Sequence, residues 1–188
     1  MSLKDREKWD DKYNAPDRAV ASLPSSWLES HAALLPGRGK ALDLASGEGR
    51  NAVFAAQLGY EVDAVDISSV GLEKAKRLAD EKKIKISTIN VDLDNYSLQK
   101  GHYDLILCFN FLERRLFPEI IDALKPGGFL FYETFSTAYL KYSGFKREWV
   151  LEENELLTAF RELHIINYRE VDSAEQKQGF ASIIAKKK

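Results

Sequence analysis

The glycine-rich segment 40–51 (KALDLASGEGRN) constrains the fold of this chain more than any other, because an apolar run passes directly into a turn. The run after Lys40 has the length and composition of a buried strand, and Gly47 and Gly49 interrupt it. Residues 51–58 (NAVFAAQL) then resume with helical spacing. A strand, a glycine turn and a helix in this order leave free backbone N–H groups at the helix N-terminus. Such an end suits a bound carboxylate or phosphate.

A second strand, which ends in an acidic residue, follows the glycine-rich segment. Residues 61–66 (EVDAVD) alternate as a strand and end in the carboxylate of Asp66. This carboxylate is placed to reach ribose hydroxyls, while Gly47 and Gly49 allow the backbone to approach a ligand closely. Together the two segments predict a site for a nucleoside cofactor.

The rest of the chain continues the alternation of strands and helices, which indicates a parallel sheet covered on both faces. The last two strands have no helix between them, so one of them must run antiparallel. A turn is expected at 125–128 (KPGG). The predicted strands are 40–44, 61–66, 85–90, 103–109, 129–135, 165–171 and 180–185. The predicted helices are 1–13, 25–34, 50–58, 68–82, 114–124 and 152–163, with Pro16 interrupting the first and Ser68 or Ser69 capping the fourth.

Composition limits the class of protein. The 188 residues carry a net charge of −2, so no global positive field attracts nucleic acid or an anionic membrane. One cysteine, Cys108, and three scattered histidines predict neither a disulfide framework nor a protein-bound metal. No apolar run approaches transmembrane length, and we expect a cytoplasmic protein. We also expect one domain over 1–188, with a helical lid and lead-in over 1–36 and the core over 37–188.

Four motifs give the chain a resemblance to class I S-adenosylmethionine-dependent methyltransferases. They are residues 43–49 (DLASGEG), Asp66 at the end of the second strand, Asp92 after the third, and 125–128 before the fifth. The resemblance implies an α/β fold, a Rossmann-like doubly wound sheet of seven mostly parallel strands in the order 3-2-1-4-5-7-6. The final strand is antiparallel, and helices cover both faces.

Within this superfamily the chain most resembles the small tellurite-resistance-like methyltransferases. The shared features are a Trp-Asp-x-x-Tyr lead-in beginning at Trp9, the Gly-Arg-Asn of 49–51 and the Asp-Leu-Asp of 92–94. Ala45 stands where the family has a glycine. Its methyl group should leave the loop intact, although cofactor affinity could fall.

The resemblance implies a role for each matching residue toward S-adenosylmethionine. Asp43 would lie below the methionine amino group, with the backbone at Gly47 and Gly49 closing on the methionine portion. Asp66 would accept hydrogen bonds from the ribose hydroxyls, and Ile67 would pack on the adenine. The cofactor-binding set implied is Trp9, Tyr13, Asp43, Ala45, Gly47, Gly49, Asn51, Asp66, Ile67, Asp92, Leu93 and Phe109.

The adenine and the reactive methyl group have their own expected neighbours. Asp92 would accept from the adenine amino group, and the Leu93 N–H would meet a ring nitrogen. Phe109 and Asn110, at the end of the fourth strand, would lie near the methyl group. These positions all fall at the carboxyl ends of strands, where ligands of open α/β sheets bind.

The substrate-pocket candidates are Tyr13, Asn110 and Glu133. Glu133 is unusual in a buried strand, and either local N–H groups cap it or it faces the pocket, which we favour slightly. Trp9 and Tyr13 either staple the first helix to the core or form a lid that excludes water. Cys108 lies in an apolar strand and is expected to serve packing.

Two other functions use the same residues. Gly47-x-Gly49-x-x-Ala52 fits a dinucleotide fingerprint, with Asp66 near the position for an NAD ribose. Against it, Asp43 would stand near a pyrophosphate, Asp92 would have no role, and no second domain holds a hydride acceptor. A non-catalytic module that binds S-adenosylmethionine is the remaining alternative, because Ala45 and the lack of a convincing base permit it.

The acceptor is predicted to be a small molecule. The fourth strand ends CFNFLERR rather than in the Asn/Asp-Pro-Pro-Tyr/Phe of many amino-nitrogen methyltransferases, and no Pro-Cys follows it. The absent base favours a soft or preionised nucleophile such as a thiol, selenium or tellurium species. Residues 136–148 form an insertion where such folds vary to suit the substrate. We expect a monomer or a homodimer, with no nucleic-acid or membrane partner.

Overall fold

A seven-stranded sheet in the order β3-β2-β1-β4-β5-β7-β6 organises the part of the chain described by the computed structural model, residues 3–15 and 23–188. Strands β1 to β5 are parallel, and β7 runs antiparallel to both of its neighbours. The predicted strand order and the reversed last strand are therefore confirmed. The strands are β1 Lys40–Leu44, β2 Glu61–Asp66, β3 Ser87–Asn90, β4 Tyr103–Phe109, β5 Leu124–Phe135, β6 His164–Ser173 and β7 Gln178–Lys186.

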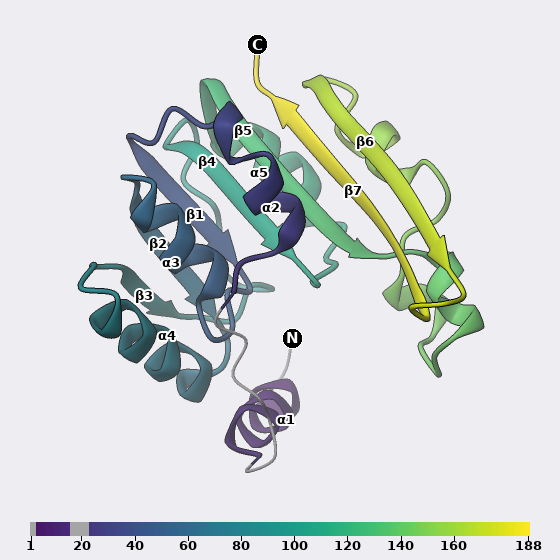
Figure 1. Cartoon of the computed structure of the whole chain (residues 1–188), viewed down its shortest axis with the longest axis horizontal. Coiled ribbons are helices and arrows are strands. Elements are labelled where there is room, and N and C mark those ends of the chain that lie inside the picture. The colour runs from purple at the N-terminus through teal and green to yellow at the C-terminus, as the bar shows by residue number, and fades with distance from the viewer. Residues whose placement is uncertain (1–2, 16–22) are drawn as a thin grey trace.

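Helices lie on both faces of this sheet, and α1 lies beyond the carboxyl ends of the parallel strands (Figure 1). Ser68 caps α4 by accepting a hydrogen bond from the Gly71 N–H at 3.0 Å, as one of the two predicted alternatives requires. The helices are α1 Leu3–Asn14, α2 Ser26–Ser30, α3 Arg50–Gln57, α4 Ser69–Glu81, α5 Leu116–Ala123 and α6 Glu155–Ala159, with 3₁₀ turns η1 Ala32–Leu34, η2 Thr137–Lys141 and η3 Arg147–Trp149.

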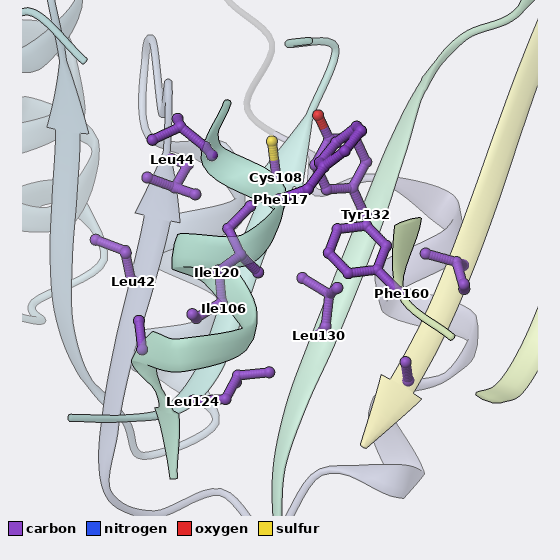
Figure 2. Close-up of a cluster of buried hydrophobic side chains, with 14 of the residues drawn as sticks. Leu42, Leu44, Ile106, Cys108, Phe117, Ile120, Leu124, Leu130, Tyr132 and Phe160 are labelled. Atoms are coloured by element: carbon purple, nitrogen blue, oxygen red, sulfur yellow. The ribbon is translucent and has the colours of Figure 1, made fainter. Parts of the chain in front are cut away.

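The central strand β4 shows why these sequences are almost continuously apolar. Leu105 and Leu107 belong to the core under α2 and α3, whereas Ile106 and Cys108 belong to the core under α5 and α6. Figure 2 shows the second of these clusters, in which Phe117 of α5 lies close to Tyr132 of β5. A strand buried on both faces has no polar side to display. Each fully buried leucine or phenylalanine contributes roughly 1.5–3 kcal/mol.

Two predicted helices are too long, each for a local reason, and one prediction stays untested. The helix expected at 25–34 ends at Ser30, because His31 leaves helical geometry before the 3₁₀ turn η1. The helix expected at 152–163 is reduced to α6, because Asn154 adopts a left-handed conformation at φ 58°. Pro16, expected to interrupt the first helix, lies outside the described residues.

The predicted turn at 125–128 lies inside β5 as a bulge. Tyr103 pairs with Leu124 and Leu105 with Phe129, so the four residues between are set out of register. Gly127 supplies the positive φ of 81° that the bulge needs, and its N–H bonds to the Lys187 carbonyl at 2.9 Å. The turn composition is realised within the strand because the neighbouring C-terminal segment satisfies its backbone.

Gly49 lies against α4 at a point that leaves no room for a side chain. It is the N-cap of α3 at φ 78°, and a Cβ there would lie 2.4 Å from the Cβ of Ala75 in α4. Gly101 offers a matched control, because it has a similar φ of 56° but nothing within 4 Å of an added Cβ.

We therefore predict that Gly49→Ala destabilises the protein much more than Gly101→Ala does. Both variants carry the left-handed backbone cost of roughly 1–2 kcal/mol. Only Gly49→Ala adds a clash, which typically costs about 1–3 kcal/mol more. Urea unfolding of the two variants measures this difference, and equal losses would show that the α3–α4 contact is not limiting.

Candidate functional site

A cavity of about 910 Å³ lies at the carboxyl ends of the strands and is bordered by α1 and by the segment 135–149. Most of the predicted site residues meet here. Those that line the cavity are Trp9, Tyr13, Asp43, Ala45, Gly47, Asn51, Asp66, Ile67, Phe109 and Asn110. Its volume falls at the upper end of the range of roughly 300–1,000 Å³ for small-molecule sites.

The glycine loop between β1 and α3 is built from left-handed residues. Ala45, Gly47 and Gly49 have φ of 52°, 53° and 78°. The loop is braced from behind, because the Ser46 N–H bonds to the Val65 carbonyl at 3.0 Å. Ala45 is thus a strained non-glycine residue at the position where the family is expected to have glycine.

Asp66, at the end of β2, holds this loop in place. It is only 5 % exposed, and its two oxygens accept from the N–H groups of Gly47 and Ser68, each at 2.8 Å. Burial raises the pKa of Asp66, and these backbone N–H groups oppose the rise. A carboxylate oxygen can accept more than one hydrogen bond, so Asp66 keeps acceptor capacity toward the cavity that it lines.

Asp43, at the end of β1, is a buried carboxylate with an unsatisfied oxygen. It is 2 % exposed, and its Oδ2 has no hydrogen-bond partner among the described residues. Burial raises its pKa to about 7; the Ala52 N–H opposes the rise, Asp66 adds to it and Arg50 opposes it. An unpaired acceptor that lines a cavity suits a cationic or hydrogen-bond-donating ligand group.

The Trp-Asp-x-x-Tyr lead-in fixes α1 against the N-terminus of α4. Asp10 accepts from the Ser68 hydroxyl and, at 3.3 Å, from the Val70 N–H. Lys74 of α4 donates to the Tyr13 carbonyl and pairs with Glu48 at 3.2 Å. An acidic side chain at a helix N-terminus is favourable, so these polar contacts dock α1 on the core.

Tyr13 also helps to dock α1, because its ring packs against two glycines, Gly47 and Gly71. Its ring is buried and stacks on Trp9 with 5.7 Å between centroids. A Cβ on Gly47 would lie 2.4 Å from the Tyr13 hydroxyl, and one on Gly71 would lie 3.1 Å from its ring. Trp9 and Tyr13 therefore staple α1 to the core and also line the cavity.

Glu133 does not line the cavity, which corrects the expectation that it faces the pocket. Its carboxylate accepts from the Ser182 hydroxyl at 2.6 Å and from Arg169 Nη2 at 3.1 Å. Ser25 also donates to it at 3.3 Å. Its partners come from β6, β7 and the start of α2, elements distant in the sequence, rather than from the local N–H groups of the other alternative.

Asp92, Leu93 and Gly49 also lie outside the lining of the cavity. Asp92 accepts from the Asp94 N–H at 3.0 Å and from Asn95 Nδ2 at 3.1 Å within its own turn. The Leu93 side chain is fully buried, and its carbonyl accepts from Arg115. Their expected roles toward adenine remain predictions.

Sequence reasoning missed several residues of the cavity. A sequence signal existed for those in the insertion 136–148, which was expected to vary with the substrate. Tyr139 of that insertion lines the cavity, whereas Tyr142 instead donates to Asp172 at 2.7 Å. The missed lining residues are Asp5, Lys8, Lys12, Ser46, Glu48, Arg50, Phe111, Leu112, Thr134, Phe135, Phe145 and Trp149.

Among the described residues, no group of three or more histidine, cysteine, aspartate or glutamate side chains could hold a metal ion. None of the described helices is long and apolar enough to cross a membrane.

Comparisons with known proteins point to one family. A family model described as "Tellurite resistance protein TehB" matches residues 1–179. A relative from Haemophilus influenzae, "Probable S-adenosyl-L-methionine-dependent methyltransferase TehB", is 28% identical over 170 residues, which cover 79% of this chain and 57% of that protein. The chain thus spans little more than half the length of this relative.

Solved structures share the fold. The crystal structure of TehB from Haemophilus influenzae matches with a TM-score of 0.71 at 20% identity, covering 96% of this chain and 67% of that one. A structure titled for the conversion of a disulfide bond into a thioacetal group during echinomycin biosynthesis matches with a TM-score of 0.73 at 16% identity, covering 97% and 91%. The fold is therefore the Rossmann-like fold of class I methyltransferases.

The burial of Asp43 predicts a pH-dependent stability in the ligand-free protein. Because its pKa is about 7 in the folded protein and 3.8 for an ordinary aspartate, the folded state keeps a proton that the unfolded state releases. Stability should therefore fall as the pH rises from about 4 to about 7. Asp43→Asn removes this dependence and should be more stable than the wild type at pH 8, by about 1.4 kcal/mol for each pKa unit of the shift.

Urea unfolding of both proteins at pH 5, 6, 7 and 8 measures the effect. Asp66 also has a raised pKa and contributes a slope of the same sign in both proteins, so the difference between the two curves isolates Asp43. Parallel curves would show that Asp43 ionises at an ordinary pH.

Proposed function

Because the chain belongs to the tellurite resistance protein TehB family, we propose that it is an S-adenosylmethionine-dependent methyltransferase acting on a small-molecule acceptor. The observation that carries the proposal is that two buried carboxylates, those of Asp43 and Asp66, line the same cavity. Asp43 presents an oxygen without a partner among the described residues, and Asp66 is held at the edge of the glycine loop. A ligand with one ammonium group and a ribose diol would satisfy both.

The residues present fit the cofactor. Asp43 would hold its ammonium group, and Asp66 would accept from its ribose hydroxyls. Ile67 would pack against its adenine. When bound, S-adenosylmethionine supplies a methyl group made electrophilic by the attached sulfonium. The chain then has to orient the acceptor and exclude water, and orientation alone can contribute about 7–11 kcal/mol in favourable cases.

Exclusion of water falls to α1 in this proposal. Trp9 and Tyr13 line the cavity from a helix that Asp10 anchors, so the lead-in acts as a lid over the core. Asn110 lies at the end of β4 in a left-handed conformation at φ 57°, with its N–H bonded to the Glu133 carbonyl at 2.8 Å. A strained residue fixed at a strand end is a pocket candidate for positioning the acceptor.

The acceptor is proposed to be ionised before it binds, as a thiol, selenium or tellurium species can be. Among the described residues, those that line the cavity include neither histidine nor cysteine. Its two buried aspartates are assigned to the cofactor. Of the other carboxylates in the lining, Glu48 is paired with Lys74. An acceptor that is already ionised therefore depends least on a base in this site.

A non-catalytic module that binds the cofactor is the second candidate. The observation for it is Ala45, a left-handed non-glycine residue in the loop that would close on the methionine portion. Turnover separates the two functions: an enzyme releases S-adenosylhomocysteine with some acceptor from a thiol, selenite and tellurite panel, whereas a binding module releases none.

The cofactor is tested by thermal unfolding alone, with S-adenosylhomocysteine and with NAD. At about a hundredfold excess over Kd, a ligand should add roughly 2.7 kcal/mol, which raises Tm on the order of 5–10 °C for a chain of this size. We expect the rise with S-adenosylhomocysteine alone. A rise with NAD alone would make the glycine loop and Asp66 a dinucleotide site.

Asp66→Asn should weaken S-adenosylhomocysteine by at least about tenfold, because hydrogen bonds to a charged group contribute roughly 1.5–3 kcal/mol each. Titration calorimetry measures the affinity, and the Tm without ligand reports any loss of loop bracing. Asp63→Asn is the matched control, since Asp63 is also a buried aspartate of β2 but pairs with Lys40 at 2.8 Å and does not line the cavity. Similar affinities in the two variants would refute the assignment of Asp66.

A further inference from the structure

One side of the cavity is a cluster of aromatic rings that the cofactor assignment does not use. It consists of Phe135, Tyr139, Phe145 and Trp149, and we call it the aromatic wall. Phe135 stacks on Tyr139 with 4.4 Å between centroids. Phe145 meets Phe135 edge-on at 5.2 Å and Trp149 at 6.1 Å. All four rings come from the end of β5 and the segment that follows it.

The outer half of the aromatic wall is exposed to an unusual degree. Phe145 is 39% exposed and Trp149 is 47% exposed, although both line the cavity. Phe111 and Leu112 also line the cavity and are partly buried, so they add further apolar surface to it. Large apolar side chains that border a cavity without being buried mark a binding surface for an apolar ligand.

Positive charge flanks the exposed end of the aromatic wall. Lys8 Nζ lies 5.9 Å and Lys146 Nζ 5.2 Å from the centre of the Trp149 ring. Lys8 lines the cavity together with Lys12 and Asp5 of the same helix, whereas Lys146 also lies 3.7 Å from Glu148. A ligand whose ring packs on the wall would place an anionic substituent within reach of Lys8.

We propose that the acceptor is a small planar aromatic thiol that carries an anionic substituent, with its ring packed on the aromatic wall. This inference rests on the proposed methyl transfer and specifies its substrate class. The aromatic wall is the reason to expect a ring, and the neighbouring lysines are the reason to expect an anionic substituent. A thiol is inferred rather than a phenol because a thiol ionises near pH 8.5 and a phenol only near 10, so a thiol depends less on a general base, and the described lining contains no histidine to serve as one.

The transfer balances without a further reactant. The thiol first loses its proton to solvent. A lone pair of the thiolate sulfur then forms the new bond to the methyl carbon, and the bond from that carbon to the sulfonium breaks, leaving its electron pair on the cofactor sulfur. The products are a neutral thioether group and S-adenosylhomocysteine.

An inorganic oxyanion such as selenite or tellurite fits this surface less well. Such an ion is strongly hydrated, and moving it against apolar surface has a cost unless donors replace its water. Phe135, Phe145, Phe111 and Leu112 offer no side-chain donor, so the donors of this surface are limited to Tyr139, Trp149 and the lysines. The wall therefore favours an organic acceptor over an oxyanion.

The experiment compares acceptors that differ in the ring. The probes are 4-mercaptobenzoate, 3-mercaptopropionate, selenite and tellurite, each with S-adenosylmethionine and the full chain, and the readout is S-adenosylhomocysteine released. We expect kcat/KM for 4-mercaptobenzoate to exceed that for 3-mercaptopropionate, which has the same thiol and carboxylate without the ring, by at least about tenfold. We expect no comparable turnover of the two oxyanions.

Variants of the wall separate packing from the greater acidity of an aromatic thiol. Phe145→Ala and Trp149→Ala should each raise KM for 4-mercaptobenzoate by several-fold to tenfold while leaving 3-mercaptopropionate unchanged. The Kd for S-adenosylhomocysteine should stay within twofold. Leu34→Ala is the matched control, because Leu34 is 39% exposed, as Phe145 is, but does not line the cavity. Tm values of the three variants verify that each is folded.

The outcomes distinguish the two proposals. If S-adenosylhomocysteine binds but the oxyanions turn over best, or if the wall variants leave KM for 4-mercaptobenzoate unchanged, the aromatic thiol is overturned and methyl transfer stands. If S-adenosylhomocysteine binds and no probe turns over, the aromatic thiol is overturned and the binding module gains support. If S-adenosylhomocysteine does not bind, the proposed function itself is wrong.

Discussion

The carboxylate of Asp66 is the interaction on which the rest of the site depends. One oxygen holds the Gly47 N–H of the glycine loop, and the other holds the Ser68 N–H at the start of α4. Ser68 in turn caps α4 and donates to Asp10, which docks α1. A single side chain at the end of β2 therefore holds the glycine loop directly and α1 indirectly, through Ser68 and Asp10.

This arrangement places two acidic groups in a buried site before any ligand arrives. Burial raises the pKa of both Asp43 and Asp66, and the charge of Asp66 raises the pKa of Asp43 further. The folded protein is less stable with both groups charged than it would be with neutral side chains there. A ligand that brings a cation and hydroxyl donors relieves this cost, so the same burial that weakens the empty protein strengthens ligand binding.

The sequence was sufficient for the parts of the molecule that are set by local pattern. The strand order followed from the resemblance, and the ends of β1, β2 and β4 followed from apolar runs that stop at glycine or a polar residue. Long-range partners were not predictable in the same way. Glu133 has partners on three distant elements, and the bulge in β5 depends on the Lys187 carbonyl, so neither could be read from adjacent residues.

The two ends of the cavity also differ in how far the sequence predicts them. The end assigned to the cofactor is made from residues at consecutive strand ends, whose spacing the sheet fixes, and its motif is visible in a few residues around Gly47. The aromatic wall comes from the end of β5 and the segment that follows it. Stacked rings and the backbone hydrogen bonds of Thr137 and Leu151 hold this segment in place. Because Phe145 and Trp149 contribute little to the buried core, their substitution alters the acceptor surface without loosening the loop that Asp66 braces. On the proposed function, acceptor choice can therefore change without altering cofactor binding, and the wall rather than the glycine motif is where we expect information about the acceptor to lie.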